Sequence, residues 1–164
     1  RQRGHDARLL TSRAQPLPML PLKGPYALRD IARSARFYGI AYKQPSKFPI
    51  AGQAPSRAFY WANERDPALA KKLAQTLYQA FFVEDRDISS PEITADVAAT
   101  LGFKRDEVLA ALNDLAVKDR LKNEVDAAIK LGVFGSPYIV IDNEPFWGID
   151  RFDQIERWLA HGPF

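Results

Sequence analysis

The chain has 164 residues, of which 46% are hydrophobic and 26% are charged, a balance that supports a folded domain and argues against wholesale disorder. Its 23 basic and 20 acidic side chains leave a net charge of only +3, which does not by itself indicate a nucleic-acid partner. Because the sequence has no cysteine, a disulfide framework, a thiolate zinc site and a cysteine nucleophile are excluded within these residues.

Targeting and metal-binding signals are weak throughout the chain. No apolar run reaches the roughly 18 residues of a membrane span, and the first residues lack the apolar core of a signal peptide, so we expect a cytoplasmic protein. The two histidines, His5 and His161, lie far apart and predict no metal site. The chain begins without methionine, which suggests that further residues precede Arg1.

The first two thirds of the chain predict an irregular segment followed by consecutive helices. Prolines interrupt residues 1–24, whereas residues 25–132 carry apolar side chains at helical spacing with short links between them. The clearest pattern is Leu69, Leu73, Leu77 and Phe81, which recur every four residues and predict a buried helix. The expected helices are 25–38, about 57–63, 67–82, 90–101, 104–116 and 118–131.

Local signals mark several helix boundaries. Asp66 before Pro67 is typical of an N-cap followed by proline in the first turn. Ser89 and Glu92 have the spacing of a capping box, which predicts the start of another helix. The charged run at 84–87 is expected to be a solvated loop.

The last third changes character and predicts a β-hairpin closed by a helix. Tyr138–Ile141 is rich in β-branched residues, Asp142 and Asn143 are turn residues, and 145–148 can return as a second strand. Asp150 is then expected to cap a helix over 151–160. A two-stranded hairpin is marginal alone, so further strands or helices should cover it.

The amino-acid sequence of this last third resembles that of a known family. The stretch "GVFGSPYIVIDNEPFWGIDRFDQIERWL", together with "LKGPYALRDIARSARFYGI" and "LYQAFFVEDRDISSPEITADVAATLGF", is similar to 2-hydroxychromene-2-carboxylate isomerases and to their relatives, the kappa-class glutathione transferases. The resemblance covers about residues 22–160. It implies an α/β, thioredoxin-like fold with a cis proline at Pro137.

The resemblance also implies a domain organisation. Residues 1–24 would be an irregular segment, 25–118 an all-α insertion domain, and 119–164 the C-terminal part of a thioredoxin-like domain. The N-terminal βαβ unit of the family is absent from the sequence, and with it the serine that faces the glutathione sulfur. The catalytic residue is therefore expected upstream of residue 1.

In the family, the proline region binds glutathione, and this chain offers matching positions. With a cis Pro137, the backbone of Ser136 would face outward and pair with an extended peptide. The acidic residue that meets the γ-glutamyl amine would be Asp150, with Trp147, Gly148 and Ile149 beside it. Each has a structural alternative: a turn for Ser136–Pro137, a helix cap for Asp150 and core packing for Trp147. Ile149 stands where the family often has a polar residue, which removes one possible donor.

The resemblance further suggests a substrate site for a small aromatic carboxylate. Lys23 would attract the carboxylate, Tyr26 would donate a hydrogen bond, and Phe48 would line the ring pocket together with the aromatic residues Tyr60 and Trp61. A solvated lysine and core packing of the aromatic residues are the alternatives.

The implied reaction is glutathione-dependent isomerisation of 2-hydroxychromene-2-carboxylate to trans-o-hydroxybenzylidenepyruvate, in aromatic hydrocarbon degradation. Glutathione acts as cofactor because it is regenerated. The alternatives are a glutathione transferase of the kappa type, a DsbA-like thiol oxidoreductase whose cysteines would lie upstream, and an inactive truncated member. Relatives are commonly dimers, so a homodimer is possible, and neither nucleic acid nor membrane is an expected partner.

Overall fold

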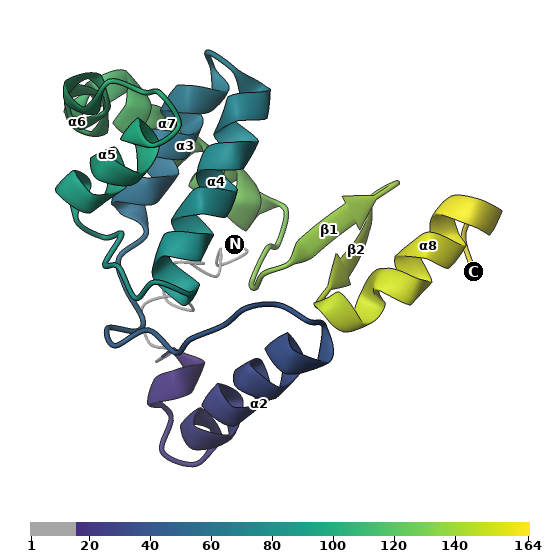
Figure 1. The fold of residues 1–164 in the computed structure, drawn as a ribbon. Helices are drawn as coiled ribbons and strands as arrows, with labels where there is room; N and C mark the ends of the chain where they lie inside the picture. Colours follow the sequence, from purple (N-terminus) through teal and green to yellow (C-terminus); the bar gives the residue numbers. More distant parts are fainter. Residues whose placement is uncertain (1–15) are drawn as a thin grey trace, which may run out of the picture. The chain divides into compact units, whose positions relative to one another are not determined.

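The computed structural model describes residues 16–164, which divide into two compact units between Lys122 and Asn123 (Figure 1). The first unit holds η1 (Leu17–Met19), α2 (Lys23–Phe37), α3 (Gln53–Asn63), α4 (Pro67–Phe82), α5 (Pro91–Ala99) and α6 (Arg105–Asn113). The second holds β1 (Tyr138–Ile141), β2 (Glu144–Trp147), η2 (Ile149–Arg151) and α8 (Phe152–His161), while α7 (Leu115–Lys130) crosses the boundary. The first part of the predicted irregular segment, with His5, lies outside the described residues.

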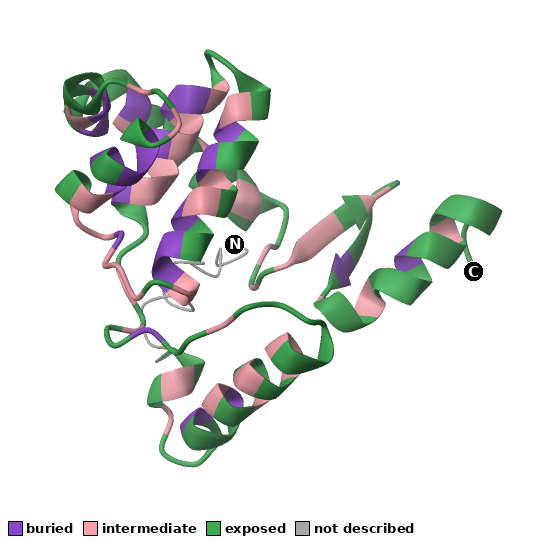
Figure 2. Ribbon diagram, in the orientation of Figure 1, coloured by how far each residue is buried: buried purple, intermediate pink, exposed green. Residues whose placement is uncertain are grey.

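The core of the first unit lies among α3, α4, α5 and α6, where Figure 2 shows most of the buried residues. On α4 the four-residue repeat buries Leu73, Leu77 and Phe81, which confirms the predicted buried helix. Val108 and Leu112 of α6 face the same core. Because apolar side chains recur along one face of each helix, packing these faces together removes them from water.

Two helix starts show how local polar groups set the boundaries. Asp66 caps α4 as predicted, because its carboxylate accepts hydrogen bonds from the N–H groups of Ala68 (2.9 Å) and Leu69 (3.0 Å). The prediction for α5 was wrong by one residue: Ser90, not Ser89, is the N-cap and accepts from Ile93 N–H at 3.3 Å. The reason is that Pro91 occupies the first helical position, so the residue before it becomes the cap.

The charged run at 84–87 is not merely a solvated loop. The Asp85 carboxylate accepts from Ser46 N–H at 2.7 Å and lies 3.4 Å from the Lys43 ammonium. Asp87 pairs with Lys47 at 2.7 Å. These contacts join two segments about forty residues apart, and the backbone bond from Lys43 N–H to Phe82 C=O reinforces them. We call this set of contacts the carboxylate clamp.

The clamp predicts a pH-dependent stability. The hydrogen bond from Ser46 N–H lowers the pKa of Asp85 below its ordinary value of 3.8, and the Lys47 bond lowers the pKa of Asp87 likewise. A carboxyl whose pKa is lower in the folded state stabilises the fold above its unfolded pKa, and that stability is lost as the pH falls through the folded pKa. We therefore expect Asp85→Asn and Asp87→Asn to reduce the stability difference between pH 7 and pH 3, measured by urea unfolding with circular dichroism.

Asp119→Asn, at an exposed carboxyl of α7, is the matched control for charge removal. If it flattens the pH dependence as much as the clamp variants do, the clamp is not the cause.

The second unit is built on a short antiparallel hairpin. Tyr138 pairs with Trp147 and Ile141 with Glu144, and the turn residues Asp142 and Asn143 both have positive φ (52° and 67°), as a two-residue type I′ turn requires. On one face of the hairpin Phe146 is buried, and its ring lies 5.7 Å from that of Trp158 on α8. The predicted hairpin and closing helix are therefore confirmed.

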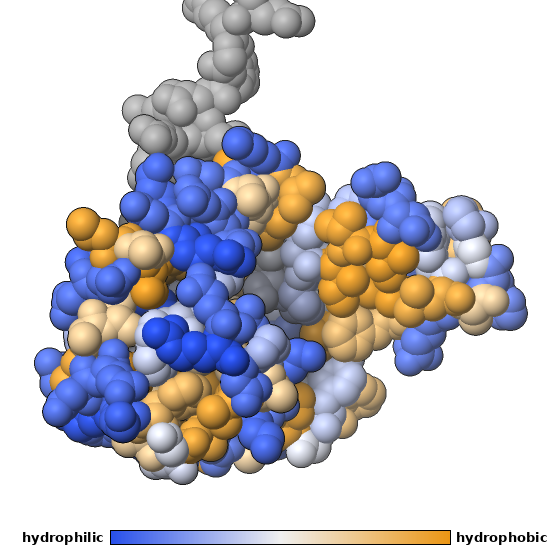
Figure 3. Space-filling view, turned by 90° about the horizontal axis from the view of Figure 1, so that it is seen from above, coloured by the Kyte–Doolittle hydropathy of each residue, from blue (hydrophilic) through white to orange (hydrophobic). Residues whose placement is uncertain are grey.

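Several apolar side chains that the helical pattern assigned to a core are exposed instead. Leu115 is 75% exposed, Leu159 is 70% exposed, and Val125 and Ile129 of α7 are also exposed. Figure 3 shows hydrophobic surface interspersed with hydrophilic surface, including a large patch toward the right, where the hairpin and α8 lie in Figure 1. Periodicity identifies the apolar face of a helix, but it does not say whether another element covers that face.

None of the helices within residues 16–164 is both long and apolar enough to cross a membrane.

Candidate functional site

The loop between α7 and β1 has a backbone that is open to a ligand at Ser136. The Ser136–Pro137 peptide bond is cis, as predicted. Ser136 is exposed, and within residues 16–164 we find no hydrogen bond to its N–H or C=O. The next carbonyl, that of Pro137, accepts from Gly148 N–H at 3.0 Å, which joins this loop to the end of β2.

An aromatic cluster of Phe134, Tyr138 and Trp147 lies beside this loop. The Phe134 ring stands edge-on to Trp147 at 4.9 Å and to Tyr138 at 5.5 Å. Trp147 is 54% exposed, so it is not the core aromatic that the alternative interpretation required. The exposed rings give the loop an apolar border.

The residues after β2 differ from the prediction at Asp150. We expected Asp150 to cap the final helix, but it lies within the 3-10 turn η2, and the residue before α8 is Arg151. The Asp150 carboxylate lies 3.1 Å from the Arg151 guanidinium, and the Asp150 side chain is 69% exposed. Gly148 (φ 101°) ends the strand in a left-handed conformation and so turns the chain directly into η2.

The Asp150 carboxylate also crowds Gly148. A Cβ on Gly148 would collide with Asp150 Oδ1, so the carboxylate lies against the residue whose N–H binds Pro137. The structure therefore brings Trp147, Gly148, Ile149 and Asp150 to the end of the strand that borders Ser136 and Pro137. Ile149 is 41% exposed and adds an apolar side chain there.

The three residues predicted to bind substrate lie in the first unit. Lys23 begins α2 and is exposed. Tyr26 is 63% exposed, and its hydroxyl accepts a hydrogen bond from Arg33 at 3.1 Å. Phe48 packs against Phe81 and Phe82, with ring centroids 6.3 and 6.4 Å away, and is part of the border of the helical core.

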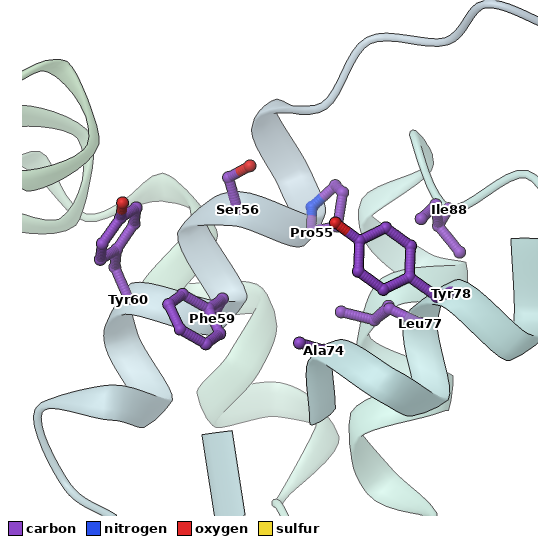
Figure 4. A pocket seen from close by; sticks show the side chains of 8 residues that line it. All are labelled: Pro55, Ser56, Phe59, Tyr60, Ala74, Leu77, Tyr78 and Ile88. Atoms are coloured by element: carbon purple, nitrogen blue, oxygen red, sulfur yellow. The ribbon is translucent and has the colours of Figure 1, made fainter. Parts of the chain in front are cut away.

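The first unit also has a pocket of its own, between α3 and α4, with a volume of about 270 Å³ (Figure 4). Its walls are mostly apolar, and three of the lining residues carry hydroxyl groups. The lining residues are Pro55, Ser56, Phe59, Tyr60, Ala74, Leu77, Tyr78 and Ile88. Of the predicted aromatic residues, Tyr60 lines this pocket, whereas Trp61 is buried and packs on Phe103.

Across the part of the chain that the structure describes, no three His, Asp or Glu side chains are grouped so as to hold a metal ion.

Comparisons with known proteins identify the family. The profile of the DSBA-like thioredoxin domain matches residues 5–160. The chain belongs to this family. In keeping with it, the fold is a DsbA-type thioredoxin-like fold that is mostly helical, with a small two-stranded sheet.

The individual relatives include kappa-class glutathione transferases and a 2-hydroxychromene-2-carboxylate isomerase. Glutathione S-transferase kappa 2 of Caenorhabditis elegans is 29% identical over 161 residues, which cover 90% of this chain and 71% of the relative. The 2-hydroxychromene-2-carboxylate isomerase of Pseudomonas putida is 27% identical over 141 residues, 86% of this chain and 68% of the relative. A solved 2-hydroxychromene-2-carboxylate isomerase shares the fold, with a TM-score of 0.77 at 24% identity over 94% of this chain and 74% of that structure.

Two features were not predicted: in the second unit, the Trp147 indole occupies the space of a Gly135 side chain, and in the first unit, a pocket lies beside Tyr78. Gly135 was visible in the sequence as the second glycine of the Gly-Val-Phe-Gly stretch, but nothing there indicated its neighbour. The pocket depends on how α3 packs against α4, which no local signal reveals.

Proposed function

We propose that this protein binds glutathione at the Ser136 loop and catalyses the isomerisation of 2-hydroxychromene-2-carboxylate. The observation that carries the proposal is the open backbone of Ser136, next to the Pro137–Gly148 hydrogen bond and the exposed carboxylate of Asp150. Isomerases and kappa-class transferases among the relatives support the same class of enzyme.

The residues of the loop fit a tripeptide thiol. An extended peptide needs an unpaired N–H and C=O to pair with, and Ser136 has both as far as residues 16–164 are concerned. An ammonium group needs an accessible carboxylate, which Asp150 supplies. Because Gly148 has no side chain, the Asp150 carboxylate can lie against its backbone and so stays close to the loop.

When bound, glutathione would supply a thiolate that adds reversibly to the conjugated acid. The chain's own residues would hold and orient the two reactants. Ser136 would align the tripeptide, and Asp150 would hold its amine. A substrate role for Lys23, Tyr26 and Phe48, which all lie in the first unit, stays a prediction.

Transfer of glutathione to an electrophile is the second candidate, because three of the relatives are kappa-class transferases. Both reactions would use the same thiol-binding loop. They differ in the fate of the thiol, which isomerisation regenerates and transfer consumes.

Calorimetric titration with glutathione, followed by an ultraviolet assay with the chromene acid, tests the proposal. We expect saturable binding, and a spectral change that requires glutathione but leaves the thiol concentration unchanged. A falling thiol concentration with an electrophilic aryl halide, and no change with the chromene acid, would favour transfer. Absence of glutathione binding would refute both.

A further inference from the structure

Gly135 lies directly against the indole of Trp147. A Cβ built on Gly135 would collide with Nε1 and would lie only 3.0 Å from Cε2 and 3.1 Å from Cδ1, all atoms of the five-membered ring. Gly135 is not among the glycines with positive φ, so the backbone itself does not require glycine. The indole is what excludes a side chain at residue 135.

The indole is held in this position by its neighbours in the second unit. Trp147 stands opposite Tyr138 in the hairpin, and Phe134 meets both rings edge-on. Phe134 is 70% exposed, so these contacts do not fill a core. The buried residue of the hairpin, Phe146, faces Trp158, and Phe146 alternates with Trp147 along the strand, so the two side chains point to opposite faces.

Two consecutive residues thus hold the two neighbours of Ser136. Trp147 limits Gly135 through its ring, and Gly148 binds Pro137 through its N–H. Ser136 lies between these two fixed points, and its own N–H and C=O take no part in either contact. The orientation of the Ser136 backbone is therefore set by the contacts of its two neighbours, Gly135 and Pro137.

We propose that Trp147 is a positioning residue for the ligand-binding backbone of Ser136, and that residue 135 must be glycine because the indole occupies the space of a side chain. The inference rests on the proposed binding of glutathione at Ser136. It assigns Trp147 a role that does not require contact with the ligand, and it assigns a role to Gly135.

The contact predicts a non-additive pair of substitutions. Gly135→Ala forces the indole or the loop to move, so we expect glutathione to bind about tenfold more weakly, as misplaced binding groups do. Trp147→Val removes the ring, frees the loop and also weakens binding. In the double variant the alanine no longer meets a ring, so Gly135→Ala should add little to the effect of Trp147→Val.

Calorimetric dissociation constants for glutathione would be measured for the unmodified protein, both single variants and the double variant. Gly52→Ala is the matched control, because a Cβ there meets only Ser56 Oγ at 3.9 Å, and we expect it to leave binding unchanged. Circular dichroism would establish folding. If Gly135→Ala does not fold, the Trp147→Val protein, which keeps the glycine, still tests the positioning role through its weakened binding.

The outcomes separate the two proposals. If the unmodified protein does not bind glutathione, the proposed function fails and this inference with it. If it binds, and Gly135→Ala binds equally well or the two effects simply add, the function stands and the positioning role is wrong. Unchanged binding by a folded Trp147→Val protein would also overturn it.

Discussion

Replacing Asp150 with asparagine should weaken glutathione binding by roughly tenfold or more, because a hydrogen bond to a charged group contributes about 1.5–3 kcal/mol. The carboxylate is 69% exposed and lies against Gly148, at the end of the strand that binds Pro137. Asparagine keeps the shape and removes the charge that would hold the γ-glutamyl amine. The dissociation constant should rise, while turnover at saturating glutathione should change little.

A ligand without the amine distinguishes this role from a structural one. N-acetylated glutathione should bind the unmodified protein as weakly as glutathione binds Asp150→Asn, and the variant should not discriminate between the two ligands. The Asp150–Arg151 pair is exposed, so its loss should cost little stability. Asp153→Asn, at an exposed carboxylate in the first turn of α8, is the control. Equal weakening by both substitutions would indicate a general charge effect rather than a specific contact.

Local chemistry allowed the most reliable predictions from the sequence. The Asp142–Asn143 turn, the Asp66 cap and the apolar period of α4 each depend on residues within a few positions of one another. For such features the backbone preferences and the hydrogen-bond partners are both contained in the local sequence. The hairpin and α4 were predictable for this reason.

The failures share a different cause. Asp150 had the residue type and the position of an N-cap, but Gly148, two residues earlier, has a positive φ and is the N-cap of a 3-10 turn that comes before α8. The carboxylate clamp joins Lys43 and Ser46 to Asp85, and sequence spacing gives no sign of such a contact. Leu115 continues the apolar helical spacing of residues 104–116, but it is exposed, and no pattern specifies whether another element covers such a residue.

The candidate site also has some features that local sequence predicts and others that depend on tertiary contacts. A short and specific stretch of sequence contains Ser136 and Pro137. The resemblance to the family predicted a ligand-binding role for them, which apolar periodicity alone did not. The contact between Gly135 and Trp147 depends on the strand register and on the path of the preceding loop. It therefore required coordinates, although both residues stood within the stretch that resembles the family.

Replacing Leu73 with alanine should destabilise the first unit by about 3 kcal/mol, the middle of the range for buried leucines. Leu73 is fully buried among α3, α4 and α5, and its removal leaves a cavity that packed helices close only in part. Urea unfolding followed by circular dichroism at neutral pH would measure the change. The midpoint should fall with little change in the slope.

Leu115→Ala is the matched control, because it deletes the same atoms from a side chain that is 75% exposed. At such a surface position the change should stay within about 0.5 kcal/mol. Helix propensity differs little between the two residues, so it cannot account for a large difference between the variants. If both substitutions destabilise the protein equally, Leu115 is covered in the folded protein, and its assignment to the surface is wrong.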